Sequence, residues 1–362
     1  MQNVASPAWA EIDETAIRHN LRLIRQRAGQ ARVYVVCKGH GYGFDALRVA
    51  RLAQQEGMGA LACGDAADAA RIRAAGIALP ILLYATTLAE ALPAIAQDGV
   101  VVTAHDERSL QVCLQHRLAF SLKLDTGFGR LGFTEADLPL LENAAAAHPD
   151  LGPLGAYTHL SDAREIVTVA SQAGRFRAMA DSIERAGWSQ LERMVASTRI
   201  LLSHPDLVLD AVNPGRAVYG MLEPPYDTMI DCKPALAAGR ARVIGVKSVL
   251  AGTLLGYSTS PVERDTVVAV AAFGFANGYP RMPGGGWALV RGQRVGIVGP
   301  RHTEHTILDV TEVPGVAVGD VVTFLGRDGE QEITAAELVE STGVPLIELV
   351  ARLASGSPAR AP

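Results

Sequence analysis

Lys38 is the residue whose position in this chain most favours chemistry. It follows a run of β-branched and apolar residues, Val33–Cys37, and it opens a glycine-rich turn, Gly39–Gly43. A lysine at the end of a buried strand is partly desolvated, which lowers its pKa and makes it competent as an imine-forming amine or a general base. The glycines allow backbone to approach a ligand closely. A lone lysine at a strand end is more commonly a solvated side chain, so a chemical role needs support from the rest of the chain.

The elements that position Lys38 form a repeating pattern. Short apolar runs alternate with alanine-rich stretches of helical character, as in parallel strands that are covered on both faces. Eight such units predict a (β/α)8 barrel of the TIM type, whose active site lies at the C-terminal ends of the strands. Lys38, the 125–130 loop, His159 and Thr198 each fall just past a predicted strand. The runs lie at 33–37, 59–63, 81–84, 100–103, 120–124, 154–157, 193–196 and 209–213.

A second domain is predicted beyond about residue 230, where short strands follow one another with turns between them and little helix. We expect a barrel domain at 8–230 that includes a helix from residue 13 to 21, and an all-β domain at 231–353. A tail at 354–362 is expected to be disordered because alanine, proline, glycine and serine dominate it. The β-domain strands are predicted at 242–249, 267–270, 287–290, 294–298 and 320–326.

Composition and charge limit the classes of function. The formal net charge is -5, and 49% of the 362 residues are hydrophobic, so neither nucleic acid nor a membrane surface is an expected partner. Met1–Pro7 lacks the features of a secretory signal, and no segment has about 18 uninterrupted apolar residues, which predicts a cytoplasmic protein. The cysteines are scattered without a CxxC pair or nearby histidines, which favours reduced thiols and no metal site.

Several segments resemble, in order, the motifs of the alanine racemase family, enzymes of fold type III built on pyridoxal 5'-phosphate (PLP). The order and the span over nearly the whole chain make the resemblance far more specific than one glycine-rich turn. It implies PLP as the cofactor, a small-molecule amino acid as the substrate, and an N-terminal strand at 8–12 that pairs with the C-terminal domain. The segments are Val35–Gly43, Leu122–Gly132, Gly155–Leu160, Pro214–Gly220, Leu255–Ser258 and Gly274–Arg281.

The resemblance implies catalytic roles for four residues. Racemisation removes a proton from one face of the α-carbon and returns it to the other, so it needs two bases. Lys38, which would also bind PLP, matches the family's base on one face, and Tyr257 of the partner subunit matches the base on the other. A homodimer would then share its active sites. His159 matches the histidine that lowers the pKa of that tyrosine, and Arg130 matches the arginine that contacts the cofactor's phenolic oxygen and the substrate carboxylate.

Further residues match cofactor contacts. Tyr42, Thr198 and the backbone at Gly215 and Arg216 match the phosphate site, and a hydroxyl and backbone N–H groups suit phosphate oxygens. Lys123 matches a lysine that some members carry as a carbamate to position the arginine. Without the resemblance, Thr198 would be interpreted as a helix cap, His159 as a core histidine, and Lys123 as an ion-pair partner, for example of Asp125.

Four departures from the family pattern surround the cofactor and substrate. Asn213 stands where the family has an arginine that donates to the pyridine nitrogen, and an amide carries no charge to repel a ring proton. Thr303 and Glu304 replace a Met-Asp pair beside the substrate, which opens room for a bulkier or hydroxylated side chain. Asn277 replaces an aspartate, and the tail lacks the family's C-terminal tyrosine.

These observations favour a divergent PLP-dependent amino-acid racemase or epimerase, whose amino acid the sequence does not identify. One alternative is another PLP reaction on the same scaffold, such as retro-aldol cleavage, hydroxymethyl transfer or decarboxylation. A second is a non-catalytic PLP-binding protein. Tyr257 argues against that second alternative, since a carrier has no use for an opposite-face base.

Overall fold

The structure is a computed structural model that describes residues 6–281 and 285–362. The chain divides into two compact units. One consists of Ala16–Gly41 and Asp45–Lys233, and we call it the barrel unit. The other, the C-terminal unit, contains the described parts of Met1–Thr15, Tyr42–Phe44 and Pro234–Pro362.

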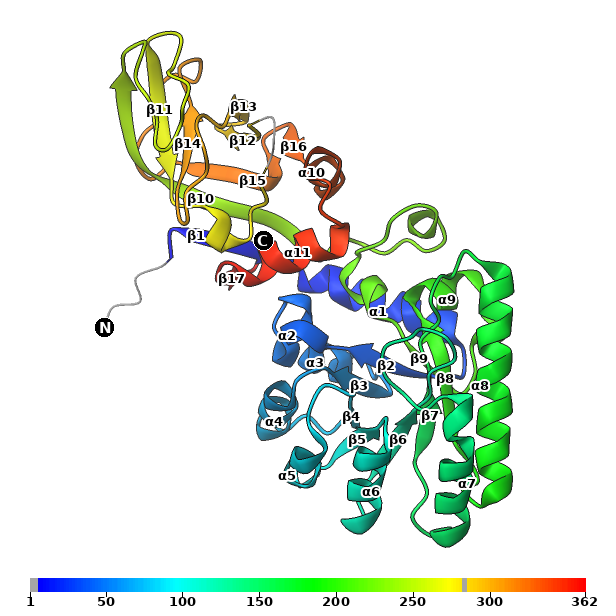
Figure 1. Ribbon diagram of the computed structural model, residues 1–362. Helices are drawn as coiled ribbons and strands as arrows, with labels where there is room; N and C mark the ends of the chain where they lie inside the picture. Colours follow the sequence, from blue (N-terminus) through cyan, green and yellow to red (C-terminus); the bar gives the residue numbers. More distant parts are fainter. Residues whose placement is uncertain (1–5, 282–284) are drawn as a thin grey trace. The chain divides into compact units, whose positions relative to one another are not determined.

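Eight parallel strands form the closed barrel that the sequence predicts (Figure 1). The last strand pairs with the first, with Arg32 opposite Ala211 and Val33 opposite Val212. All eight predicted apolar runs contain a strand. The strands are β2 (Arg32–Val36), β3 (Ala60–Cys63), β4 (Ile81–Leu83), β5 (Val100–Ala104), β6 (Phe120–Lys123), β7 (Gly155–Tyr157), β8 (Glu192–Ser197) and β9 (Ala211–Asn213).

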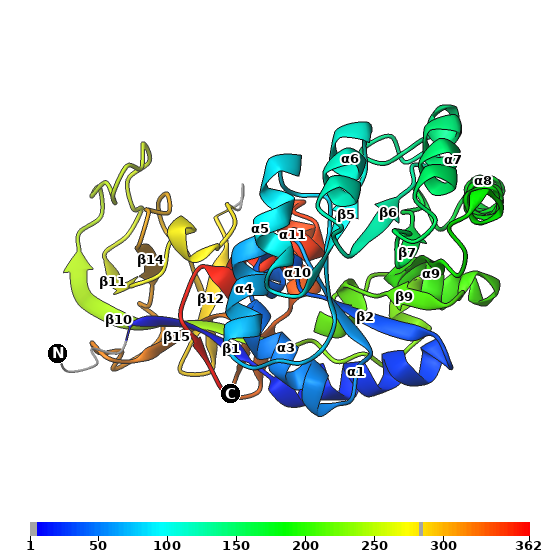
Figure 2. The same cartoon turned by 90° about the horizontal axis from the view of Figure 1, so that it is seen from below.

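Helices surround the strands on the outside of the barrel (Figure 2). They form where apolar residues recur with helical spacing, and in α3, α4 and α6 an aspartate caps the start. In α6, for example, Asp106 and Ser109 build a capping box, and Leu110 and Cys113 lie on the buried face. The helices are α1 (Glu14–Ala28), α3 (Ala46–Gln55), α4 (Ala66–Ala74), α5 (Leu92–Ala96), α6 (Glu107–Gln115), α7 (Leu138–Ala147), α8 (Ile166–Ala186) and α9 (Thr198–Ser203).

The interior of the barrel is filled by side chains. Leu82, Tyr157, Met194 and Ala211 form a buried cluster against which Tyr34, Tyr84 and Val101 pack. A filled interior leaves no channel, so a ligand must bind at the strand ends and the loops that follow them.

The C-terminal unit is built on the long strand β10 (Leu236–Val249). It pairs antiparallel with β1 (Ala8–Ile12), β11 (Thr266–Ala271) and β15 (Val321–Asp328). The predicted β domain is therefore present, and β1 pairs with it as the resemblance implies. Further elements are β12 (Trp287–Val290), β13 (Gln293–Gly296), β14 (Thr306–Asp309), β16 (Gln331–Ile333), α10 (Ala335–Thr342) and α11 (Leu346–Ser355).

The prediction of a disordered tail at 354–362 is wrong. α11 continues to Ser355, and β17 (Ala359–Arg360) pairs parallel with β1. The Ala10 N–H donates to the Pro358 carbonyl at 3.0 Å, and the Arg360 guanidinium lies 4.4 Å from the ring centroid of Trp9. The free edge of β1 supplies hydrogen-bond partners to the tail, and the composition of the tail does not predict them.

In residues 6–281 and 285–362, no helix combines the length and apolarity that crossing a membrane requires.

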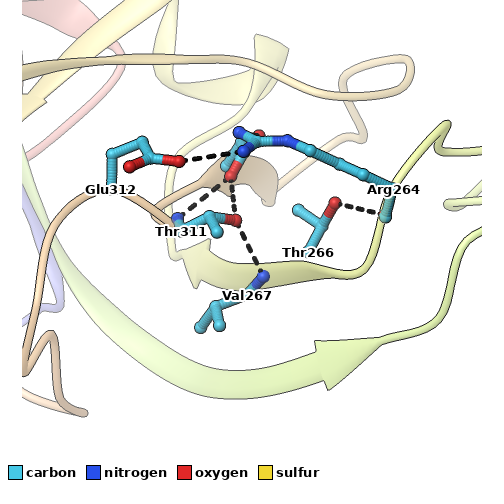
Figure 3. Close-up of polar contacts among 6 residues, drawn as sticks. Arg264, Thr266, Val267, Thr311 and Glu312 are labelled. Carbon is cyan, nitrogen blue, oxygen red and sulfur yellow. Dashed lines mark hydrogen bonds and ion pairs between the residues drawn. The ribbon is translucent and has the colours of Figure 1, made fainter.

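A polar network holds the start of β11 against the segment after β14 (Figure 3). The Thr311 hydroxyl donates to the Asp309 carboxylate at 2.6 Å and accepts the Val267 N–H at 3.0 Å. Arg264 spans Asp309 and Glu312. Burial raises the pKa of Asp309, but the Thr311 hydrogen bonds and the Arg264 charge outweigh it, and the net pKa is lowered.

Thr311→Val should therefore lower the free energy of unfolding by about 1–2 kcal/mol, because it removes one donor and one acceptor from partly buried partners. Glu312→Gln is the matched control, since the Glu312 carboxylate is exposed and an exposed ion pair contributes little.

Ionised Asp309 stabilises the fold above its unfolded pKa, and this contribution is lost as the pH falls through its folded pKa. Urea unfolding at several pH values measures both effects. Equal losses in the two variants would contradict the role given to Thr311.

Candidate functional site

The turn that carries Lys38 is left-handed. In the short segment α2 (Lys38–Tyr42), Gly39, His40 and Gly41 have φ of 62, 53 and 68°. The Gly41 N–H closes the turn on the Cys37 carbonyl at 2.8 Å. A non-glycine residue in this conformation costs roughly 1–2 kcal/mol, so the glycines are needed to build the turn itself. His40 Nδ1 lies 2.8 Å from the Asp68 carboxylate, which holds the strained residue in place.

Lys38 lies at the end of β2 beside the end of β3. A Cβ at Gly64 would approach the Lys38 Cβ to 2.8 Å, so this position must be glycine for Lys38 to lie where it does. The lysine side chain is partly exposed at the open end of the barrel. Partial burial nonetheless lowers its pKa, and the positive charges of Arg130 and Arg216 add to the effect. A larger share of the Lys38 amine is therefore uncharged at neutral pH, which an imine-forming amine or a general base requires.

Lys123, the last residue of β6, is 6% exposed. Its ammonium donates to the Leu124 carbonyl at 3.3 Å and lies 5.2 Å from the ring centroid of Tyr157. Burial lowers the pKa of Lys123 to about 7; the Asp125 charge opposes this shift and the Arg130 charge adds to it. A substantial share of this amine is uncharged near neutral pH.

Asp125 orders the loop that carries Arg130. Its carboxylate accepts the backbone N–H groups of Gly127, Phe128 and Gly129 at 2.8–3.2 Å. Arg130 then lies over the Phe128 ring, 4.7 Å from its centroid.

His159, just past β7, joins this group. The Phe128 ring packs edge-on against the imidazole with centroids 4.9 Å apart. Burial lowers the pKa of His159 to about 4, and the charges of Lys123, Lys38 and Arg130 contribute. The imidazole is therefore neutral at physiological pH. The barrel brings together four of the predicted residues, Lys38, Lys123, Arg130 and His159.

Thr198 connects the ends of β8 and β9. Its Oγ1 accepts the N–H groups of Gly215 and Ala217 at 3.1 and 3.3 Å, which leaves its O–H to donate to a ligand. Ser197 is the N-cap of α9, so Thr198 does not cap the helix that it begins; its hydroxyl instead accepts the Ala217 N–H in the first turn of the 3-10 helix at Arg216–Tyr219. The Arg216 guanidinium is held by Glu223 at 2.7 Å.

Asn213 ends β9 and is 8% exposed. Its Nδ2 donates to the Tyr84 hydroxyl at 3.2 Å. Since β2 and β3 separate β9 from β4 in the barrel, this bond crosses the inside of the barrel. Sequence reasoning missed Tyr84, although it ends an apolar run just as Lys38 follows one.

The other predicted site residues, Tyr42, Tyr257, Thr303 and Glu304, belong to the C-terminal unit. Tyr257 is 83% exposed, and its ring centroid lies 5.2 Å from that of His302. The His302 carbonyl accepts the Phe275 N–H, and the Thr303 carbonyl accepts the Ala276 N–H. Three loops that carry family motifs thus meet around His302, a neighbour of Tyr257 that the sequence analysis did not predict.

Asn277 has a structural use in this loop cluster. Its Oδ1 accepts the Gly274 N–H at 2.9 Å, and its Nδ2 donates to the Gly356 carbonyl at 3.2 Å and the Ser357 hydroxyl at 3.0 Å. The amide supplies both a donor and an acceptor, which an aspartate would not, so this departure from the family ties the loop to the chain's last residues.

Comparison with known proteins agrees with this geometry. The alanine racemase N-terminal domain family matches residues 12–223, and the C-terminal domain family matches residues 237–360. The chain belongs to the alanine racemase family. Relatives named alanine racemase include one from Sorangium cellulosum, 31% identical over 97% of this chain and 98% of its own length, and one from Desulforamulus reducens, 32% identical over 97% and 98%.

Solved structures agree as well. The crystal structure of the alanine racemase from Streptomyces lavendulae has a TM-score of 0.87 at 28% identity and covers 99% of this chain and 97% of that one. The alanine racemase of Streptomyces coelicolor A3(2) has a TM-score of 0.87 at 26% identity, with 98% and 97% covered.

Replacing Lys123 with methionine should stabilise the protein near neutral pH. The folded pKa of Lys123, about 7, lies below the ordinary lysine value of 10.5, so between these values the unfolded chain binds a proton that the folded chain has lost. The free energy of unfolding of the wild type therefore rises with pH in this window, and its deficit relative to Lys123→Met should shrink. Unfolding titrations at several pH values in bicarbonate-free buffer measure this difference, with a variant of an exposed lysine, Lys247→Met, as the control. If the free energy of unfolding changed with pH in the same way in Lys123→Met and in wild type, the lowered pKa of Lys123 would be contradicted.

Proposed function

We propose that this chain is a PLP-dependent amino-acid racemase. Its family membership supports an enzymatic racemase and does not favour the other PLP reactions or a carrier role. The observation that carries the proposal is the lowered pKa of Lys38 at the end of β2, within a group of positive charges from Lys123, Arg130 and Arg216. An amine of this kind suits both covalent capture of an aldehyde and proton transfer.

The residues at the end of the barrel fit PLP. Lys38 would hold it covalently, and the Thr198 hydroxyl and the backbone at Gly215 and Arg216 would bind its phosphate. Tyr42 stays a phosphate ligand that the family resemblance predicts. Clustered positive charge suits a phosphate dianion, and the Asn213 Oδ1 has no partner among the described residues. Arg130 would contact the phenolic oxygen and the substrate carboxylate. When bound, PLP withdraws electrons from the substrate's α-carbon and so acidifies its proton.

Two residues would move protons. Lys38, with its lowered pKa, would remove or return the α-proton on one face, and the Tyr257 hydroxyl would act on the other. His159, which is neutral, would hold Tyr257 of the partner subunit by a hydrogen bond. It would add no positive charge beside Lys38, Lys123 and Arg130. Retaining a base on each face supports exchange between the two enantiomers.

We propose a homodimer in which Tyr257 enters the partner's site. In a single chain Tyr257 is 83% exposed and is therefore surrounded by water. A closed active site excludes water from the groups that transfer protons. Leu254 and Phe275, on two of the loops that meet at His302, are 57 and 59% exposed. Apolar side chains gathered beside a catalytic residue suit a surface that a second subunit covers.

Lys123 would carry a carbamate, and Thr303 and Glu304 would set the choice of substrate. The uncharged share of the Lys123 amine suits reaction with carbon dioxide to a carbamate, whose negative charge would then pair with Arg130. Thr303 and Glu304 are exposed and polar, so they suit an amino acid with a hydroxylated or larger side chain than alanine. A cytoplasmic location stays a prediction.

Borohydride reduction tests the lysine directly. Protein loaded with PLP should absorb in the near-visible, and reduction should fix the cofactor to Lys38, as peptide mapping would show. Lys123→Met should be labelled as wild type is, whereas Lys38→Ala should not be labelled. Labelling of another lysine in the wild-type chain would refute the assignment.

Mixed dimers test the shared site. Tyr257→Phe should lose about two to four orders of magnitude in racemisation, the usual contribution of a positioned acid or base. Mixing it with inactive Lys38→Ala chains should restore activity, because one of the two hybrid sites has both groups. Each variant mixed with itself is the control. No recovery after demonstrated subunit exchange would count against a site built from two chains.

A further inference from the structure

A hydrogen bond across the barrel fixes the amide of Asn213. Its Nδ2 donates to the Tyr84 hydroxyl at 3.2 Å. The Tyr84 ring is itself held by the Tyr157 ring, with centroids 5.6 Å apart, and the Tyr157 hydroxyl lies 3.1 Å from the Thr103 hydroxyl. Residues of β5 and β7 thus hold the Tyr84 ring, just past β4, beside the amide.

The other end of the amide is an unused acceptor. Asn213 is 8% exposed, and within residues 6–281 and 285–362 its buried Oδ1 has no hydrogen-bond partner. Leaving a buried acceptor unpaired is destabilising, and a ligand that brings a donor recovers that free energy. Ser197, at the end of the neighbouring β8, pairs with Asn213 in the strand register, and Lys38 follows β2 on the other side. The acceptor therefore lies within the proposed cofactor site.

The chemistry of PLP identifies the donor. Its phosphate and phenolic oxygens are acceptors, and they face the Thr198 hydroxyl and Arg130 in the proposed function. With the aldehyde carbon bonded to Lys38, the ring nitrogen is the remaining polar position, and it donates only when it carries a proton. On the basis of the proposed function, we infer that Asn213 accepts a hydrogen bond from the protonated ring nitrogen of PLP, with Tyr84 as its positioning residue. The family arginine at this position donates instead, so Asn213 reverses the direction of the bond.

The protonation changes what the site favours. A protonated ring nitrogen takes its proton from solvent and withdraws electrons more strongly from the substrate's α-carbon. Negative charge there is then better stabilised, and reactions that compete with proton return, such as transamination, become more frequent.

The ¹⁵N chemical shift of the ring nitrogen tests this inference. The full-length protein is reconstituted with PLP labelled at that nitrogen, and the resonance is compared with neutral and protonated pyridine standards from pH 6 to 9. We expect the wild-type resonance at the upfield, protonated position throughout. A resonance at the neutral position would overturn the inference.

Variants separate Asn213 and Tyr84 from general effects. Asn213→Asp should keep the protonated shift, and Asn213→Arg should move it to the neutral position. Tyr84→Phe frees the amide to turn its donor to the ring, so it should move the shift towards neutral. Tyr34→Phe is the matched control, since its hydroxyl bonds Glu192 inside the barrel and not Asn213. An unchanged shift in both Tyr84→Phe and Asn213→Arg would also overturn the inference.

The test is independent of the proposed function. A protein that binds PLP at Lys38 and racemises an amino acid, but shows a neutral ring nitrogen, would refute the inference alone. A protein that takes up no PLP would refute the proposed function before any shift is measured.

Discussion

Crowding of positive charge at one end of the barrel is the constraint on which the site depends. Lys38, Lys123 and Arg130 each lower the pKa of at least one neighbour. Burial is the largest cause of these shifts and the neighbouring like charges add to it, so the lysines lose protons more readily and His159 stays neutral. The same crowding favours an anionic ligand, because an anion relieves the repulsion.

Rigid local structures maintain this crowding against repulsion. The left-handed turn after β2 fixes Lys38, and a single carboxylate, Asp125, binds three backbone N–H groups and so fixes the loop with Arg130. Glu223 holds Arg216. The turn and Asp125 act on the backbone that carries Lys38 and Arg130, whereas Glu223 pairs with the Arg216 guanidinium itself.

The sequence predicts the barrel well because continuous apolar runs mark buried parallel strands. It also predicts that Lys38, the 125–130 loop, His159 and Thr198 meet, since all follow strand ends. It does not predict the bond between Tyr84 and Asn213, because that bond depends on which strands face one another across the closed barrel. The sequence also does not predict the contact between Tyr257 and His302 or the pairing of the tail at Ala359–Arg360. In both cases the partner lies on another segment of the C-terminal unit.

A barrel end built for a phosphate-bearing cofactor should bind PLP much more tightly than pyridoxal. Both carry the aldehyde, but pyridoxal lacks the phosphate dianion. We expect pyridoxal to bind at least about a hundredfold more weakly, since two charge-assisted hydrogen bonds contribute about 3 kcal/mol or more. The loss should be smaller in Thr198→Val, which removes one of the donors. Equal affinity for PLP and pyridoxal in the wild-type protein would contradict a phosphate site at the barrel end.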